Sequence, residues 1–216
     1  MPQNDLEVLS NLSSEFTKQF EDVNIVIVGA SGFLGRWLSS YFVFLAQGGS
    51  FKGSITMIVR NLSSMSELIS MNNPQTVKII ETGQIDTERY SYFKSGRTIV
   101  FFAATSTKSR ESLFAEQYVS GVGLAEKVIN SLPDGDLTFI HLSSGGIYDP
   151  TARQLLEVPS NYLIQQDSED VYILEKILLE KWSKQAEDSG LLTARNPRLF
   201  SFYGPGLDLD RHYAIG

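Results

Sequence analysis

The sequence predicts an α/β fold: a doubly wound parallel sheet with flanking helices and an extra helix at the N-terminus. Short apolar runs rich in β-branched residues recur along the chain, as expected for strands buried on both faces of a sheet. Stretches with helical periodicity lie between several of these runs, and this alternation implies right-handed crossovers between parallel strands. The expected strands are residues 24–29, 54–59, 77–80, 97–104, 137–142 and 191–200.

Four helices are expected around this sheet. The first, over residues 6–20, has apolar residues at three- and four-residue intervals, and it forms an N-terminal extension, residues 1–22, on the outside of the sheet. The others are residues 34–45, 111–132 and 170–187. Residues 149–170 show no clear period and predict a long loop, which in this architecture lies near the ligand.

The composition excludes several classes of site. The 216 residues, 42% of them hydrophobic, suit one domain with a sizeable core, and the net charge of −7 argues against non-specific binding to nucleic acid or anionic membranes. Without cysteine and with only two histidines, no disulfide, thiolate zinc site or other metal site is expected. No targeting segment is apparent, and no apolar run approaches the roughly 18 residues of a membrane span. These features predict a soluble, cytoplasmic protein.

A glycine-rich loop joins the first strand to the second helix. In "VGASGFLG", Gly29, Gly32 and Gly35 have the spacing of a dinucleotide-binding turn. The first glycine would form the turn, the second would let the backbone approach a pyrophosphate, and the third would let helix and strand pack closely. Ser31, Phe33 and Leu34 fall within the same cofactor-binding loop. The alternative is that these glycines serve turns and packing only.

The ends of the next two strands bear on the choice of cofactor. Arg60 and Asn61 stand where an NAD-binding protein would carry a carboxylate, and an arginine there can pair with a 2′-phosphate. This position favours NADP over NAD, with a solvated arginine as the alternative. Asp86 follows the third strand and is placed to meet the adenine amino group, unless it is a surface carboxylate.

After the glycine loop, a serine at the end of a strand is followed by a tyrosine and a lysine on a helix. Tyr172 and Lys176 lie four residues apart on a helix, so they project from the same side. Such a pair alone is usually ordinary helix surface, but here it follows a buried strand that ends in "HLSSGGIY". Ser144 therefore sits at the carboxyl edge of the sheet, where ligands bind in doubly wound folds.

At this point the sequence resembles the short-chain dehydrogenase/reductase superfamily, in its extended NAD(P)-dependent epimerase/dehydratase group. The resemblance rests on "GASGFLG", "FFAAT", "SSGGIY", "YILEKILLE" and "RLFSFYGPG", and a subgroup of surface-polysaccharide biosynthesis enzymes looks closest. It implies a Rossmann fold and a nucleotide-sugar substrate. It also assigns Ser144, Tyr172 and Lys176 as catalytic, and Ala103, Ala104, Tyr172 and Lys176 as cofactor-binding. The candidate substrate-binding residues are Ser144, Gly145, Ser201 and Arg198. Arg198 could reach a nucleotide phosphate or equally form a structural ion pair.

The chemistry of these residues agrees with that assignment. A phenol with a pKa of about 10 is a poor base at neutral pH, but a nearby ammonium and an oxidised nicotinamide favour phenolate. Lys176 would serve this purpose and hydrogen-bond the nicotinamide ribose. Ser144 would hold the sugar oxygen while Tyr172 removes its proton and hydride passes to the cofactor.

Departures from the family pattern narrow the expected reaction. The dehydratases carry an Asp-Glu pair after the catalytic serine or threonine, where this chain has Gly145 and Gly146, so an epimerase (an isomerase) or a 4-keto reductase is expected instead. Tyr118 and Ser201 stand where asparagine is common in the family. A non-catalytic NAD(P)-binding module or an inactive fragment is therefore the alternative. His141 is expected to be a hydrogen-bonded core residue.

The end of the chain suggests a missing part. The last residues, "RHYAIG" (211–216, including His212), resemble a mid-protein segment of the subgroup, after which a substrate-binding lobe would follow. The expected organisation is thus an N-terminal extension, residues 1–22, and a cofactor-binding domain, residues 23–216, with the C-terminal substrate lobe largely missing. Relatives in the family commonly dimerise through helices that flank the sheet, so a homodimer is also expected.

Overall fold

The computed structural model describes residues 1–12, 18–20, 22–49, 51–65, 76–85, 93–104, 121–155, 157–165 and 168–207. Its α-helices are α1 (Gln3–Leu12), α3 (Phe33–Gln47), α6 (Gly121–Ser131) and α7 (Val171–Asp188). Its strands are β1 (Asn24–Val28), β2 (Ile55–Val59), β3 (Val77–Glu81), β4 (Thr98–Phe102), β5 (Leu137–His141), β6 (Ser143–Ser144), β7 (Thr193–Arg195) and β8 (Arg198–Leu199). Short 3-10 turns are η1 (Lys18–Phe20), η2 (Leu62–Met65), η3 (Thr82–Gln84), η4 (Gly145–Ile147) and η5 (Pro150–Gln154).

Six parallel strands form the main sheet in the order β3-β2-β1-β4-β5-β7. This is the doubly wound order that the alternating pattern predicts, so the α/β fold class is confirmed. The order in which strands are added to the sheet reverses between β1 and β4: β2 and β3 lie on one side of β1, and β4, β5 and β7 lie on the other. Ile25 of β1 pairs with Ile55 on the first side and with Ile99 on the second. In such sheets the crevice for ligands opens at this point, beyond the carboxyl ends of the strands.

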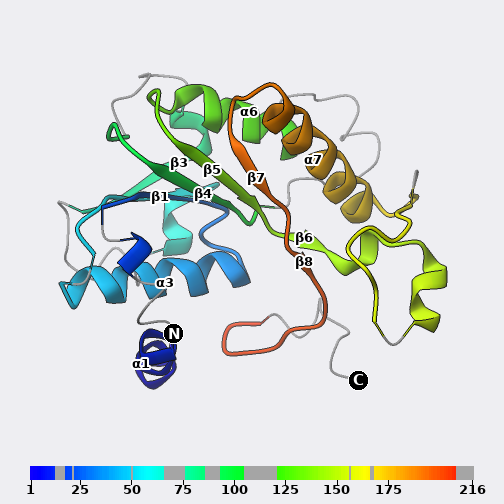
Figure 1. Cartoon of the computed structure of the whole chain (residues 1–216). Coiled ribbons are helices and arrows are strands. Elements are labelled where there is room, and N and C mark those ends of the chain that lie inside the picture. The colour runs from blue at the N-terminus through cyan, green and yellow to red at the C-terminus, as the bar shows by residue number, and fades with distance from the viewer. Residues whose placement is uncertain are drawn as a thin grey trace.

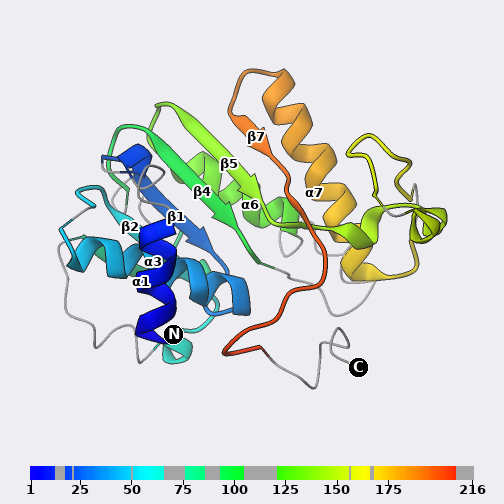
Figure 2. The ribbon, with the colours of Figure 1, turned by 60° about the horizontal axis from the view of Figure 1, so that its bottom comes forward.

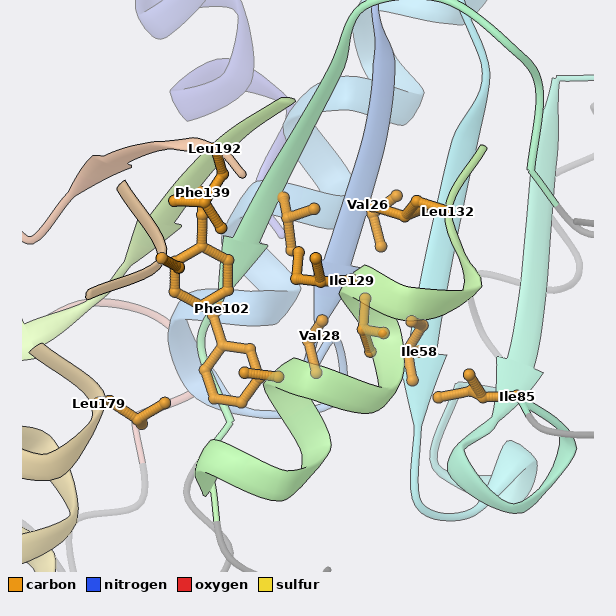
Figure 3. Close-up of a cluster of buried hydrophobic side chains, with 14 of the residues drawn as sticks. Val26, Val28, Ile58, Ile85, Phe102, Ile129, Leu132, Phe139, Leu179 and Leu192 are labelled. Carbon is orange, nitrogen blue, oxygen red and sulfur yellow. The ribbon is translucent and has the colours of Figure 1, made fainter. Parts of the chain in front are cut away.

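The strands are apolar throughout because the sheet buries both faces. Val26 and Val28 point into one hydrophobic cluster, which Figure 3 shows beside Phe102, Phe139 and Leu179. The intervening Ile25 and Ile27 belong to a second cluster on the opposite face. Alternate residues of β1 thus contribute to two cores, which explains why the strand reads as a continuous apolar run rather than an alternating one.

Helices cover both faces of the sheet (Figure 1). Helix α3 lies on one face, and α6 and α7 lie on the other. Helix α1 packs on the outside of α3, as Figure 2 shows, with Leu6 buried and Val8 and Leu9 exposed. The expected helix over 6–20 is therefore shorter in its described part, since α1 ends at Leu12 and residues 18–20 form a 3-10 turn.

The last expected strand, 191–200, is wrong as a single element. Strand β7 joins the main sheet, whereas β8 pairs with β6 in a separate two-stranded sheet. The break falls at Asn196 and Pro197: Pro197 has no N–H to donate, and its carbonyl accepts from Ser143 N at 2.9 Å. The expected long loop also contains structure, namely η5 and a bridge between Tyr148 and Ile164.

In the ranges that the structure describes, no helix is long and apolar enough to cross a membrane.

Candidate functional site

The loop after β1 is shaped by glycines that leave no room for a side chain. Gly29 has a φ of 82°, and a Cβ added to it would lie 2.7 Å from the backbone nitrogen of Ala104. A Cβ on Gly35 would collide with the carbonyl oxygen of Gly29. The ends of β1 and β4 and the first turn of α3 therefore pack backbone against backbone. Because these glycines carry no side chain, a ligand can approach the main chain of the loop closely.

Helix α3 begins at this loop without a side-chain cap. Gly32 is its N-cap residue, and among the described residues no side chain caps the N–H groups of the first turn. These N–H groups carry the partial positive charge of the helix end, which attracts anions. Together with the space that Gly29 and Gly35 preserve, this arrangement fits the pyrophosphate of a dinucleotide.

A cleft of about 1000 Å³ runs along the carboxyl edge of the sheet. Three of its lining residues, Arg36, Arg60 and Lys176, are basic, and none of the lining residues that the structure describes is acidic. In a protein with a net charge of −7, this lining is a local basic region that could hold an anion.

The cleft gathers most of the residues that the sequence singles out. Its lining includes Ser31, Gly32, Phe33, Leu34, Arg60, Ala103, Ser144, Gly145, Tyr172, Lys176 and Ser201. Gly29, Gly35 and Ala104 shape the loop behind it rather than line it. Asn61 is also outside the lining, and its side-chain oxygen accepts a bond from Ser63 N at 2.9 Å.

Ser144, Tyr172 and Lys176 meet at one end of the cleft. The Ser144 hydroxyl accepts from Gly146 N at 3.1 Å, and it is near enough to the Tyr172 phenol to lower the pKa of that group. Asp170 caps α7 by accepting from Tyr172 N at 2.9 Å, which places the tyrosine in the first helical turn. One turn later, the Lys176 Nζ lies 5.5 Å from the centre of the Tyr172 ring and donates to the Leu142 carbonyl at 2.7 Å.

Burial makes Lys176 an unusual lysine. The residue is only 3% exposed, because α7 presses it against the end of β5. Removal from water disfavours its charged form and lowers its pKa from 10.5 to about 8, although the nearby Glu175 carboxylate opposes this shift. The lysine therefore remains mostly charged at neutral pH but loses its proton far more readily than a surface lysine.

The phenol of Tyr172 has a raised pKa in this structure. Desolvation raises this pKa, although the residue is 43% exposed, and the carboxylates of Asp170 and Glu175 raise it further. Ser144 acts in the other direction and favours the phenolate. The expectation that Lys176 favours the phenolate beside a bound cofactor stays a prediction.

Arg198 forms the structural ion pair that the sequence left as an alternative. Its guanidinium bonds both carboxylate oxygens of Glu180, at 3.1 and 2.8 Å, and it does not line the cleft. This bonding raises the pKa of Arg198, so the side chain stays charged. A contact between Arg198 and a substrate stays a prediction that this arrangement does not support.

His141 is a buried core residue, as expected. Its Nδ1 lies 3.3 Å from the side-chain oxygen of Asn196, which also contacts Ser183. Its Nε2 has no hydrogen-bond partner in the described part of the chain. Burial, reinforced by the charge of Lys176, lowers the pKa of His141 to about 3, while the bond to Asn196 opposes the shift.

The sequence reasoning missed several residues of the cleft. Arg36 follows Gly35 directly and lines the cleft, while its Nε donates to the Ser31 carbonyl at 2.9 Å. Phe202 stacks on Phe33, with ring centres 5.5 Å apart, which brings the segment after β8 to the start of α3. Spacing within the glycine loop could have revealed Arg36. No local pattern reveals Phe202, because its partner lies far away in the sequence.

Some of the singled-out residues lie outside the described residues. These are Asp86, Tyr118, His212 and the rest of the terminal segment 211–216.

Solved structures share this architecture at low sequence identity. An epimerase-like protein from Burkholderia cenocepacia J2315, described as a putative epimerase, is 13% identical with a TM-score of 0.56, over 88% of this chain and 57% of the other. DesIV, a dTDP-glucose 4,6-dehydratase from Streptomyces venezuelae solved with NAD and TYD, is 12% identical with a TM-score of 0.58, over 84% and 57%. RMD from Pseudomonas aeruginosa, complexed with NADPH, is 17% identical with a TM-score of 0.53, over 86% and 56%. The chain thus spans little more than half the length of these structures.

The sequence itself gives the family. None of the curated proteins matches it. The NAD dependent epimerase/dehydratase family, however, matches residues 25–214, which include the glycine loop, Ser144, Tyr172 and Lys176. The match covers most of the chain and agrees with the parallel sheet and with the fold of the solved structures. The chain therefore belongs to the NAD-dependent epimerase/dehydratase family.

Proposed function

We propose that this protein is an NAD(P)-dependent epimerase or 4-keto reductase that acts on a nucleotide-linked sugar. The observation that carries the proposal is that Ser144, Tyr172 and Lys176 line the same basic cleft as the glycine loop. Membership of the family supports the same reading. The resemblance to surface-polysaccharide enzymes makes such a pathway the expected setting, and a cytoplasmic location and a homodimer stay predictions.

The residues of the cleft have distinct roles in this reaction. The nicotinamide ring of the cofactor, when bound, accepts or supplies the hydride. Ser144 holds the oxygen of the reacting sugar carbon, and Tyr172 takes the proton from that oxygen or returns it. Lys176, charged at neutral pH, holds the cofactor ribose and favours the phenolate once the cleft is closed to water.

The basic lining bears on the choice of cofactor. Arg36 and Arg60 both line the cleft beside the glycine loop, where either guanidinium could pair with a 2′-phosphate. We therefore expect NADP to bind more tightly than NAD. RMD, which shares the fold, was solved with NADPH, whereas DesIV was solved with NAD, so the fold alone favours neither.

The lining also bears on the class of reaction. Elimination of water from a sugar needs an acid and a base beside the catalytic serine. Here Gly145 and Gly146 follow Ser144, and the described lining of the cleft contains no carboxylate. A dehydratase is therefore disfavoured relative to an epimerase or a keto reductase.

Thermal unfolding in the presence of each cofactor tests the proposal. A ligand at about 100 times its Kd stabilises a protein by about 2.7 kcal/mol, so a clear rise in Tm is expected with NADPH and a smaller one with NADH at equal concentration. Arg60→Ala should reduce the NADPH effect more than the NADH effect. The absence of any shift with either cofactor would refute the proposal.

A non-catalytic cofactor-binding module is the second candidate. The raised pKa of Tyr172 favours it because it weakens the case for proton transfer, and Ser201 favours it because the family commonly has a substrate-positioning asparagine there. Tyr172→Phe separates the two candidates. An enzyme loses hydride transfer to a nucleotide-linked keto sugar but keeps cofactor binding, whereas a binding module retains all that it does.

A further inference from the structure

An ion pair behind the catalytic residues connects the segments that carry them. Arg198 on β8 and Glu180 on α7 are paired through two parallel bonds, Nε to Oε1 at 3.1 Å and Nη2 to Oε2 at 2.8 Å. Their side chains are only 19% and 11% exposed, respectively. Glu180 lies one helical turn beyond Lys176. The pair is therefore close to the catalytic end of the cleft, although neither residue lines it.

The pair also holds two other segments. Glu180 accepts a bond from the Ser143 hydroxyl at 2.6 Å, and Ser143 immediately precedes Ser144 on β6. Arg198 donates through Nη1 to the Ser160 carbonyl at 2.8 Å, and its guanidinium lies 4.7 Å from the centre of the Tyr148 ring. Helix α7, strands β6 and β8 and the loop around Ser160 thus meet at one guanidinium and one carboxylate.

Stability alone is a poor reason for this arrangement. Removing two charges from water costs several kcal/mol, and the attraction between them often does no more than offset that cost. What a two-bond pair does supply is geometry, since the planar guanidinium fixes both the distance and the angle to its partner. The pair fixes β8 relative to α7, and β6 is held with them because it pairs with β8 and Ser143 donates to Glu180. Strand β6 carries Ser144, and α7 carries Tyr172 and Lys176.

We propose that Arg198 and Glu180 are positioning residues, which hold Ser144 in register with Tyr172 and Lys176 without contacting the substrate. This inference rests on the proposed function, because it concerns the same three residues. It assigns Arg198 a role that the sequence did not suggest. Ser144 and Tyr172 both line the cleft, and Ser144 lowers the pKa of the Tyr172 phenol, so a shift of β6 would be felt at the reacting group.

The titration of Tyr172 tests the inference without any substrate. In the full chain labelled with ¹³C at the tyrosine ring, NMR follows each phenol with pH, and Tyr172→Phe identifies the signal of Tyr172 among the nine tyrosines. Ser144 lowers the pKa of Tyr172, so Ser144→Ala should move the titration to higher pH. The size of that change is the reference for the other variants. Arg198→Lys keeps the charge but loses the two parallel bonds to Glu180, and it should move the titration of Tyr172 in the same direction.

Arg195→Lys is the matched control. Arg195 pairs with Glu187 on the same helix at 3.7 Å, but the two side chains are 64% and 31% exposed and neither lines the cleft. This control should leave the Tyr172 titration unchanged. If Arg198→Lys lowers the Tm while Tyr172 titrates as in the wild type, the pair is merely structural and the inference is wrong. Glu180→Gln, which retains the shape of the side chain, decides the question in the same way if Arg198→Lys fails to fold.

Turnover provides the second arm. With a nucleotide-linked keto sugar and NADPH, Arg198→Lys should slow hydride transfer on the order of 10- to 100-fold, as small misplacements of catalytic groups do, with NADPH binding unchanged. A chain that binds no cofactor and shows no turnover would refute the proposed function. The NMR result would still decide whether the ion pair positions Ser144, so the two failures can be told apart.

Discussion

The two ends of the cleft are built from different materials. At the glycine loop the site is made of backbone: Gly29 and Gly35 pack against main-chain atoms, and in the described part of the chain no side chain caps α3. At the end near Tyr172, the proposed catalytic end, it is made of buried polar side chains, with Lys176 bonded to the end of β5 and Glu180 bonded to Ser143. The first end depends on side chains being absent, and the second depends on charges being held where water is excluded. Substitutions should therefore act sterically at one end and electrostatically at the other.

Gly29→Ala should have the largest effect, because it combines backbone strain with a steric clash. Gly49 is a matched control, since its φ of 73° is similar but an added Cβ would meet nothing within 4 Å. Gly49→Ala should cost about 1 kcal/mol from the left-handed backbone alone. Gly29→Ala should cost more than about 3 kcal/mol and abolish cofactor binding, as its Cβ is forced against Ala104. Urea unfolding and cofactor titration measure both effects.

Equal losses of stability in the two variants would break the comparison. They would mean that the conformation of Gly29, and not the close approach to Ala104, is what the loop requires.

The two ends also differ in how far the sequence predicts them. The backbone course of the glycine loop is predicted, because its strand, its three glycines and its helix are contiguous and the reason for each glycine is local. Tyr172 and Lys176 are also recognisable by their spacing, and Ser144 by its place after a strand. Their surroundings are not. Arg198 is paired with a residue 18 positions earlier, which nothing in the local pattern of either residue indicates.

The split of the last strand shows the same limit. The apolar pattern of residues 191–200 is interrupted between Ala194 and Leu199, and the strand leaves the main sheet there, where the side chain of Asn196 bonds His141 and Ser183. Pro197 is a local sign of this break, but the pairing of the following residues with β6 depends on tertiary partners. Local periodicity can be recognised in a single sequence, whereas polar pairs between residues far apart in the sequence cannot.

Lys176→Met should stabilise the fold at neutral pH. This prediction tests the electrostatic cost of burying charge at the Lys176 end of the cleft. A pKa lowered from 10.5 to about 8 corresponds to a cost of about 3 kcal/mol for keeping this lysine charged. Methionine removes that cost but leaves the Leu142 carbonyl without its donor, so a net gain of about 2 kcal/mol in unfolding free energy is expected at pH 7. The unfolded chain binds more protons than the folded one between pH 8 and 10.5, so the wild type should gain stability over that range and the difference should close.

Lys184→Met is the control on the same helix. Lys184 is exposed and its pKa is raised by bonds to Asp188 and Glu187, so its removal should not stabilise the fold. Denaturant unfolding from pH 7 to 10.5 measures all three proteins. A Lys176→Met protein that is less stable than the wild type at pH 7 would mean that the lysine contributes more through its contacts than its burial costs.

His141 should produce the smallest effect, and its effect should appear at acid pH rather than at alkaline pH. Its pKa is about 3 in the folded protein against 6.5 when exposed, so the unfolded chain takes up a proton as the pH falls below 6.5 while the folded one does not. The wild type should therefore lose about 1 kcal/mol of stability between pH 7 and 5.5 from this residue alone. His141→Asn, whatever its cost at pH 7, should lack that part of the slope, and His212→Asn should retain it. If His212→Asn loses this part of the slope and His141→Asn keeps it, the acid sensitivity does not come from the buried His141. The electrostatic contrast with the glycine loop would then rest on Lys176 alone.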